Sequence, residues 1–130
     1  MDELFDQTKK YLEGKKISSE NFTKQIAFNL IPHIDAFDKD GYTKEELKMT
    51  NETKKILDDT IDVTATCVRV PVRTGHSESI NIEFAGVVEP KEALEELKKS
   101  PGIEIIEDYK NNRFPMPNDV MGRDLSLIHI

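Results

Sequence analysis

The sequence is poor in cysteine and has no long apolar run. Cys67 is its one cysteine, which excludes an internal disulfide and is typical of a protein from a reducing compartment. The most apolar stretch, residues 26–34, is interrupted by polar residues and proline, and is far shorter than the ~20 residues of a membrane-spanning helix. The first residues are acidic, whereas a secretory signal starts with basic ones. These features predict a cytoplasmic protein with no membrane partner.

An excess of basic residues is also lacking. The chain has 18 Lys and Arg against 25 Asp and Glu, and its formal net charge is −7. Nucleic-acid phosphates are bound by clustered Lys and Arg, so we expect no nucleic-acid partner. The 130 residues, 37% of them hydrophobic, suffice for one globular domain and are too few for two of ordinary size.

Periodicity and capping residues predict three helices, from residue 2 to 13, from residue 43 to about residue 57, and from residue 90 to 100. Thr43 and Glu46 form the sequence pattern of a capping box, in which each side chain satisfies backbone donors at the helix start. A proline opens the third helix, and a Pro-Gly pair ends it.

Residues 63–72 are rich in β-branched side chains, and residues 80–84 alternate apolar and polar side chains. Both patterns predict strands, joined through a turn at Thr74 and Gly75, and residues 103–106 suggest a third strand. The predicted fold class is α+β, with a mixed β-sheet flanked by helices. Between the first two helices the chain is irregular and carries an apolar patch that must be buried, namely Ile26, Ala27, Phe28, Leu30, Ile31 and Ile34.

Residues 38–41 read Asp-Lys-Asp-Gly, which invites comparison with a calcium-binding loop. Neither alignment of the loop works: with Gly41 as the invariant glycine, Ala36 and Leu47 take two essential ligand positions, and the other register also loses two. We therefore predict a polar turn leading into a helix, and no metal site.

Four residues form a candidate site. Glu45 and Lys48 are three apart and share a helix face, Arg69 interrupts the apolar face of a predicted strand, and His76 follows a turn glycine. A guanidinium on an apolar face needs an anionic partner, and a histidine titrates near neutral pH. Together they suggest a site that binds an anionic small molecule, such as a phosphorylated one, and moves a proton. Two alternatives stay open: a solvated ion pair for Glu45 and Lys48, and a surface or structural histidine.

The run T-C-V-R-V-P-V-R-T-G-H-S-E-S at residues 66–79 resembles the signature of aspartate-β-semialdehyde dehydrogenases, where an arginine and a histidine are seven apart. Residues 42–56 are similar to the family's Glu/Lys helix, and residues 25–35 and 111–124 also fall in register. The resemblance covers about residues 2–124. It implies the C-terminal substrate-binding and dimerisation domain of a bacterial enzyme.

The resemblance also implies an activity, the NADPH-dependent reductive dephosphorylation of L-aspartyl 4-phosphate to L-aspartate 4-semialdehyde in lysine, methionine and threonine biosynthesis. His76 would be the general acid/base, and Arg69 would hold the substrate carboxylate through two parallel hydrogen bonds. Lys48 would bind phosphate, and Glu45 would orient Lys48 and the substrate ammonium group. The enzyme would be a homodimer or a higher homo-oligomer.

Some family features are missing. The family's nucleophile and glycine-rich phosphate turn lie in an N-terminal domain, which makes most of the contacts with NADP. This sequence contains neither, so we expect the chain alone to be inactive. Cys67 aligns with a strand cysteine and not with the nucleophile. Residues 125–130 do not resemble the family, and we interpret them as a truncated or mis-joined reading frame. We assign no role to Gln25 or Asn29.

Two other interpretations remain. One is a relative such as N-acetyl-glutamyl-phosphate reductase, whose chemistry is similar but whose motif fits poorly around Arg69 and His76. The other is a non-catalytic dimerisation or binding module of the same fold.

Overall fold

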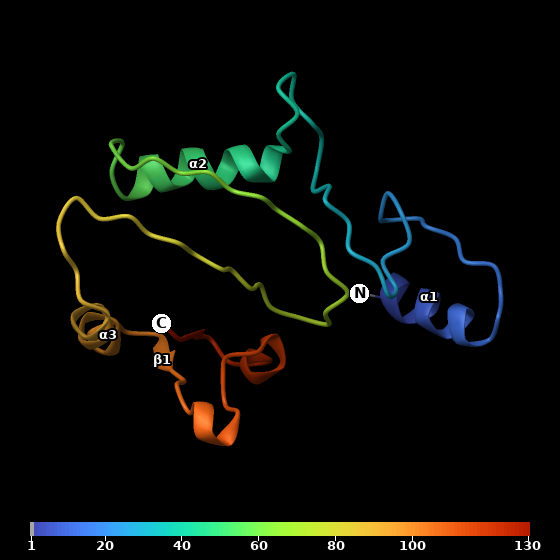
Figure 1. Cartoon of the computed structure of the whole chain (residues 1–130). Coiled ribbons are helices and arrows are strands. Elements are labelled where there is room, and N and C mark those ends of the chain that lie inside the picture. Colours follow the sequence, from blue (N-terminus) through green and yellow to red (C-terminus); the bar gives the residue numbers. More distant parts are fainter. Residues whose placement is uncertain (1) are drawn as a thin grey trace. The chain divides into compact units, whose positions relative to one another are not determined.

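The computed structural model describes residues 2–130, which divide into two compact units, residues 2–71 and residues 72–130. In chain order the elements are α1 (Asp2–Leu12), α2 (Lys44–Ile56), α3 (Pro90–Lys99), β1 (Ile103–Ile105), η1 (Tyr109–Asn111), η2 (Pro117–Val120) and β2 (Ser126–Ile128) (Figure 1). The three predicted helices and the strand after α3 are confirmed, and so is the α+β class. None of these described helices has the length and hydropathy to cross a lipid bilayer.

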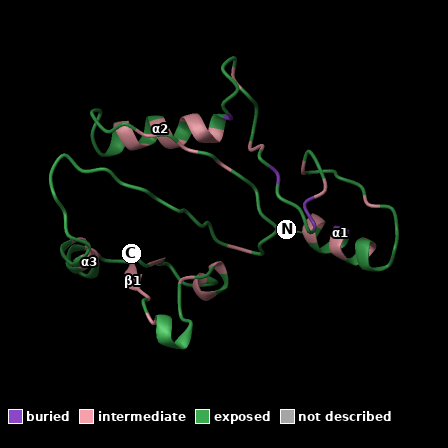
Figure 2. Cartoon of the chain, viewed as in Figure 1, coloured by how far each residue is buried: buried purple, intermediate pink, exposed green. Residues whose placement is uncertain are grey.

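The core of the first unit is small. Its buried apolar residues are Ile26, Ala27 and Ile31, which belong to the predicted apolar patch (Figure 2). Other members of that patch are not buried: the exposed fraction is 62% for Phe28 and 51% for Leu30. The patch is therefore only partly covered within this unit.

A polar residue, Gln7, is the fully buried residue of α1. Its amide nitrogen donates hydrogen bonds to the carbonyl of Ser18 at 3.0 Å and to the carboxylate of Glu3 at 2.9 Å. Its amide oxygen accepts from the backbone N–H groups of Ile26 at 2.8 Å and Ala27 at 3.2 Å. One side chain thus fastens the helix to the irregular segment that follows it, and satisfies backbone groups that would be costly to bury unpaired.

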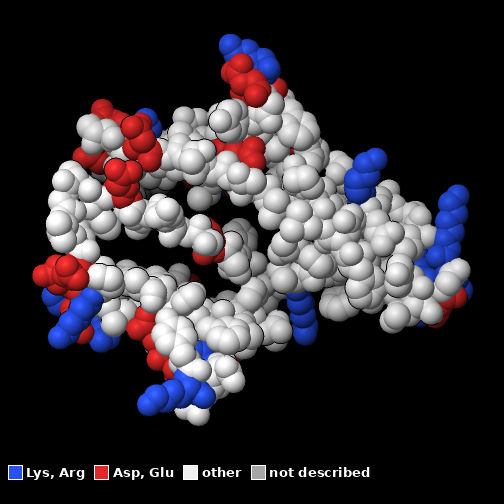
Figure 3. All heavy atoms as spheres, viewed as in Figure 1, with Lys and Arg blue, Asp and Glu red and all other residues white. Residues whose placement is uncertain are grey.

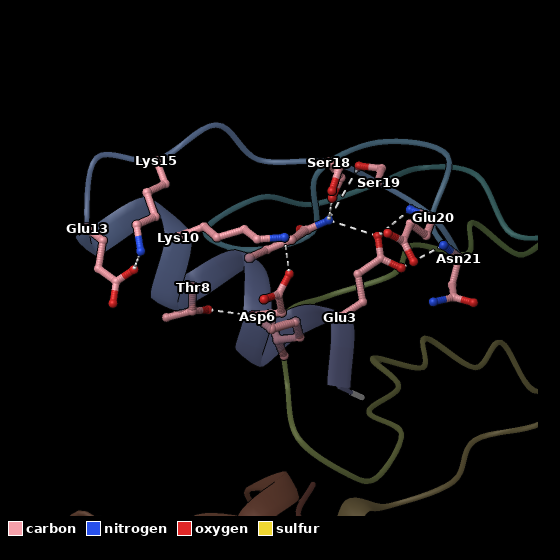
Figure 4. Close-up of polar contacts among 12 residues, drawn as sticks. Glu3, Asp6, Thr8, Lys10, Glu13, Lys15, Ser18, Ser19, Glu20 and Asn21 are labelled. Atoms are coloured by element: carbon pink, nitrogen blue, oxygen red, sulfur yellow. Dashed lines mark hydrogen bonds and ion pairs between the residues drawn. The ribbon is translucent and has the colours of Figure 1, made fainter.

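Glu3 continues this network on the same side of α1. Its carboxylate accepts hydrogen bonds from the backbone of Glu20 at 2.9 Å and Asn21 at 2.6 Å (Figure 4). Desolvation alone would raise the pKa of Glu3, but these backbone hydrogen bonds outweigh it and lower the pKa below its ordinary value. Polar contacts therefore hold the loop of residues 18–27 against α1, where apolar packing is sparse.

The start of α2 is the predicted capping box. The Thr43 hydroxyl accepts from the backbone N–H of Glu46 at 3.4 Å, and the Glu46 carboxylate accepts from the backbone N–H of Thr43 at 2.8 Å. Before it, Asp38 accepts from the backbone of Asp40 and Tyr42, both at 2.9 Å. This is the polar turn predicted for the segment, and the Asp38 carboxylate stabilises it.

The two strands predicted over residues 63–72 and 80–84 are not formed, so this prediction was wrong. In the first segment the one backbone pairing is an isolated antiparallel bridge between Ile31 and Arg69. Every residue of the second segment is exposed. The β-branched composition fits a strand, but a strand also needs neighbouring strands to satisfy its backbone groups, and none of the described residues supplies one.

The second unit is built on a short sheet. β1 and β2 are parallel, with Ile103 opposite Ser126 and Ile105 opposite Ile128. Helix α3 packs on β1, and its half-buried residues are Ala93, Leu94 and Leu97. The connection from β1 to β2 is irregular apart from η1, η2 and an isolated bridge between Asp108 and Arg113. β2 lies within residues 125–130, the tail for which no strand was predicted.

Candidate functional site

Glu45 and Lys48 lie on one face of α2, as their spacing predicted. The Lys48 Nζ is 3.5 Å from the Glu45 Oε1, and the exposed fractions of the two side chains are 54% for Lys48 and 35% for Glu45. An ion pair so accessible to water contributes little stability. It leaves an ammonium group at the surface with a carboxylate beside it, an arrangement that can exchange partners with an anionic ligand.

Arg69 lies on the extended segment that follows α2. Its backbone N–H donates to the carbonyl of Ile31 at 2.9 Å and its carbonyl accepts from the N–H of Ile31 at 3.0 Å. Its guanidinium carbon lies 5.6 Å from the ring centroid of Phe22, a cation–π distance. The backbone of Arg69 is therefore fixed, and an aromatic ring supports its side chain.

The sequence predicted that Arg69 interrupts a buried apolar face and so needs an anionic partner. Val63, Ala65 and Cys67 are half-buried as that alternation requires, but Arg69 is exposed, so the burial part of the prediction was wrong. Within residues 2–130, no carboxylate lies at ion-pair distance from the guanidinium. A guanidinium carries paired donors that match a carboxylate bidentately.

Glu46 is a residue of this region whose contact with the Arg69 segment was not predicted. Besides capping α2, its carboxylate accepts a hydrogen bond from the backbone N–H of Cys67 at 3.0 Å. The backbone hydrogen bonds from Thr43 and then Cys67 lower the pKa of Glu46 below its ordinary value, because both favour the carboxylate form. The sequence signalled the cap, which is local, but carried no signal for a contact 21 residues away.

His76 is exposed and belongs to the second unit. It follows Gly75, whose φ of +83° favours glycine. A Cβ at Gly75 would lie 3.5 Å from side-chain atoms of Pro117 and Val120, so the turn rests against η2. The chain bends at Arg73 and Thr74, but the strands that the predicted turn was to join are not formed, and the imidazole is accessible beside the bend.

Gln25 and Asn29 stabilise a local turn. The Gln25 amide donates to the carbonyl of Ala27 at 2.9 Å, and the Asn29 amide donates to the carbonyl of Gln25 at 2.8 Å. Phe28, inside this turn, has a φ of +57°, and its ring contacts that of Tyr11 with centroids 4.9 Å apart and planes tilted by 51°. These contacts give both amides a structural task in the folded chain.

Over the part of the chain that the structure describes, no three His, Cys, Asp or Glu side chains are grouped so as to hold a metal ion. On the face drawn in Figure 3, acidic and basic side chains are intermingled. The six glycines include no adjacent pair and no glycine-rich phosphate turn, so these residues do not fit the pyrophosphate of a dinucleotide. The described residues provide the ammonium group of Lys48 and the guanidinium of Arg69 in the first unit, and the exposed imidazole of His76 in the second.

Comparisons with known proteins agree with this picture. The chain is 52% identical over 126 residues to the aspartate-semialdehyde dehydrogenase of Aquifex aeolicus, covering 95% of this chain and 37% of that protein. It is 50% identical over 125 residues to the enzyme of the same name from Rickettsia bellii, with the same coverages. The chain thus spans little more than a third of the length of the curated relatives it matches.

Solved structures match equally well. The structure of aspartate semialdehyde dehydrogenase II from Vibrio cholerae, complexed with ASA, superposes with a TM-score of 0.91 at 43% identity, covering 97% of this chain and 37% of that one. A family model described as "Semialdehyde dehydrogenase, dimerisation domain" matches residues 1–128, which include β2. With the fold, the relatives and this match in agreement, the chain belongs to the semialdehyde dehydrogenase dimerisation-domain family.

Proposed function

We propose that this chain is the substrate-binding and dimerisation part of an aspartate-semialdehyde dehydrogenase. That enzyme converts L-aspartyl 4-phosphate, NADPH and a proton into L-aspartate 4-semialdehyde, phosphate and NADP. The observation that carries the proposal is the pair of exposed cations Lys48 and Arg69, with the half-buried Glu45 beside Lys48, on a fold that superposes on the Vibrio cholerae enzyme complexed with ASA. A substrate with a carboxylate at one end and a phosphate at the other needs two separate cations.

Each residue of the set has chemistry suited to one substrate group. Arg69 binds the α-carboxylate, because a planar guanidinium matches a carboxylate with two parallel hydrogen bonds. Lys48 binds the phosphate as a point charge, and its ion pair with Glu45 breaks when the phosphate binds. Glu45 then accepts from the substrate ammonium group, and the exposed His76 exchanges the proton of the reaction.

The nicotinamide cofactor supplies the hydride, and its binding belongs to another part of the enzyme, because these residues lack a pyrophosphate-binding turn. The proposed oligomer is a homodimer or a higher homo-oligomer, supported by the dimerisation-domain family. The proposed compartment is the bacterial cytoplasm. The proposed substrate and dimerisation domain is residues 1–124. Residues 125–130, interpreted from the sequence as a tail unlike the family, contain β2.

A chimera tests the function. Residues 2–128 of this chain replace the matching segment of the Vibrio cholerae enzyme, and NADPH formation is followed with aspartate semialdehyde, phosphate and NADP as substrates. We expect turnover that requires all three. A chimera that is folded and of the same oligomeric state as its parent, yet inactive, would overturn the proposal.

The 130-residue chain alone is the matched control. We expect no saturable NADPH binding by calorimetry and no turnover, since the pyrophosphate site and the nucleophile are assigned to the remainder of the enzyme. Binding of NADPH by the isolated chain would show that the cofactor assignment is wrong. The chimera experiment would still test the substrate assignment.

A further inference from the structure

Helix α2 is joined to the Arg69 segment by a single carboxylate that accepts two backbone N–H groups. The Glu46 Oε2 accepts from Thr43 at 2.8 Å, at the start of the helix, and the Oε1 accepts from Cys67 at 3.0 Å, on the extended segment. Because each oxygen has its own donor, the side chain bridges two pieces of backbone. A bridge of this kind fixes the start of the helix relative to the extended segment at Cys67.

A second contact repeats the connection one turn later. The Thr50 hydroxyl lies 3.4 Å from the carbonyl of Val63. Glu46 and Thr50 are four residues apart and so share one face of α2. The earlier helix residue, Glu46, contacts the later segment residue, Cys67, and Thr50 contacts Val63. The extended segment therefore runs back along the helix, as Figure 1 shows for the chain beside α2. Two contacts along one face also fix the rotation of the helix about its axis.

The proposed substrate residues sit next to these contacts. Glu45 precedes Glu46 by one residue and Lys48 follows it by two, so the rotation of α2 sets the directions of both side chains. Arg69 is two residues beyond Cys67, and its own backbone is held by Ile31. The Glu46 bridge therefore connects α2, which bears Lys48, to the extended segment, which bears Arg69.

We propose that Glu46 is a positioning residue, which sets the spacing between Lys48 and Arg69 by bridging α2 to the Arg69 segment. This inference rests on the proposed function, because it concerns the same substrate site. Glu46 does not touch substrate. It acts through the backbone, so that a molecule with a carboxylate and a phosphate meets both cations at once.

The side-chain chemistry gives a graded test in the active chimera. In Glu46→Gln the amide keeps one acceptor oxygen, so one of the two bridging hydrogen bonds is lost; Glu46→Ala loses both. We expect KM for aspartate semialdehyde and for phosphate to rise about tenfold in Glu46→Ala and by less in Glu46→Gln. A tenfold change is about the contribution of one hydrogen bond to a charged group. The kcat should fall by less than KM rises, because the reacting groups remain.

Two control variants separate positioning from simple loss of helix stability. Thr43→Ala removes the hydroxyl that accepts from Glu46 but leaves both N–H groups that donate to the Glu46 carboxylate. It should lower the melting temperature of the full 130-residue chain and of the chimera without raising KM. Glu52→Gln makes the same chemical change as Glu46→Gln, at an exposed position of α2, and should alter neither the melting temperature nor KM.

The outcomes distinguish this inference from the function on which it rests. A folded but inactive parent chimera overturns the proposed function, and the inference with it. An active parent whose Glu46→Ala variant keeps both KM values within twofold overturns the inference alone. So does a Thr43→Ala variant that raises KM as much as Glu46→Ala does, because the effect would then follow helix stability.

Discussion

Arg69 combines a fixed backbone with an exposed guanidinium, and its planar group lies over Phe22. We predict that Arg69→Lys lowers kcat/KM of the chimera by an amount equivalent to about 1.5–3 kcal/mol, the usual contribution of one hydrogen bond to a charged group. One ammonium cannot reproduce two parallel hydrogen bonds to a carboxylate, and it loses the planar stacking. The measurement is kcat/KM for aspartate semialdehyde.

Phe22→Leu separates the two contributions to Arg69. It removes the aromatic support but keeps the guanidinium, so its effect on kcat/KM should be smaller than that of Arg69→Lys. Near-native efficiency in Arg69→Lys would contradict the role assigned to Arg69. An equal loss in both variants would show that stacking, and not bidentate binding, is the essential feature.

His76 is exposed after a turn glycine, so its replacement opens no cavity. We predict that His76→Asn lowers kcat of the chimera by about 10²–10⁴, the usual size of general acid–base catalysis, at an unchanged melting temperature. His33→Asn is the matched control, because that ring stacks on Phe37 with centroids 4.8 Å apart. It should lower the melting temperature and leave kcat unaltered. An unchanged kcat in folded His76→Asn would remove His76 from the mechanism.

At the scale of elements, the attachment of α1 depends on Gln7 more than on its apolar stripe. The exposed fraction is 75% for Leu12 and 54% for Phe5, whereas that of Gln7 is 0%. We predict that Gln7→Leu destabilises the chain, at about 1–3 kcal/mol for each buried backbone group left without a partner. Lys9→Leu, which places the same side chain at an exposed position of α1, should change stability little. Urea unfolding followed by circular dichroism measures both, and equal midpoints would contradict the assignment.

The elements that the sequence predicted correctly are those encoded locally. The α2 start followed from Thr43 and Glu46, three residues apart, and α3 from a proline at its first position. Residues 63–72 and 80–84 had equally clear strand composition, but strand formation depends on partners elsewhere in the chain. β2 was missed for the converse reason, since its short tail segment gains its structure from pairing with β1.

The candidate site shows the same division at the scale of the whole molecule. Spacing alone predicted the Glu45–Lys48 pair, and resemblance supplied the roles of Arg69 and His76. The hydrogen bond from Cys67 to Glu46 and the stacking on Phe22 join residues far apart in the chain, and no local pattern predicts such contacts. The exposure of Arg69 also depends on what covers its segment, which the sequence alone did not determine.

The second unit carries a long exposed apolar segment, and it leads to a prediction about association. The exposed fraction is 70% for Ile80, 61% for Ile82, 53% for Phe84 and 89% for Val87. An apolar extended segment with unpaired backbone groups is a template for pairing with another chain. We therefore predict that the 130-residue chain self-associates at micromolar concentration, and that sedimentation velocity detects species larger than a monomer.

A charge on that segment should prevent the association, because a lysine in a strand-to-strand contact cannot be buried without cost. In Ile82→Lys the chain should sediment as a monomer, with α2 and its cap unaltered, since α2 belongs to the first unit and Ile82 to the second. Leu12→Lys is the matched control, as Leu12 is an exposed apolar residue of α1 and lies outside the segment. It should leave the association unchanged. A monomeric parent chain, or association that survives Ile82→Lys, would show that this segment is not the contact surface.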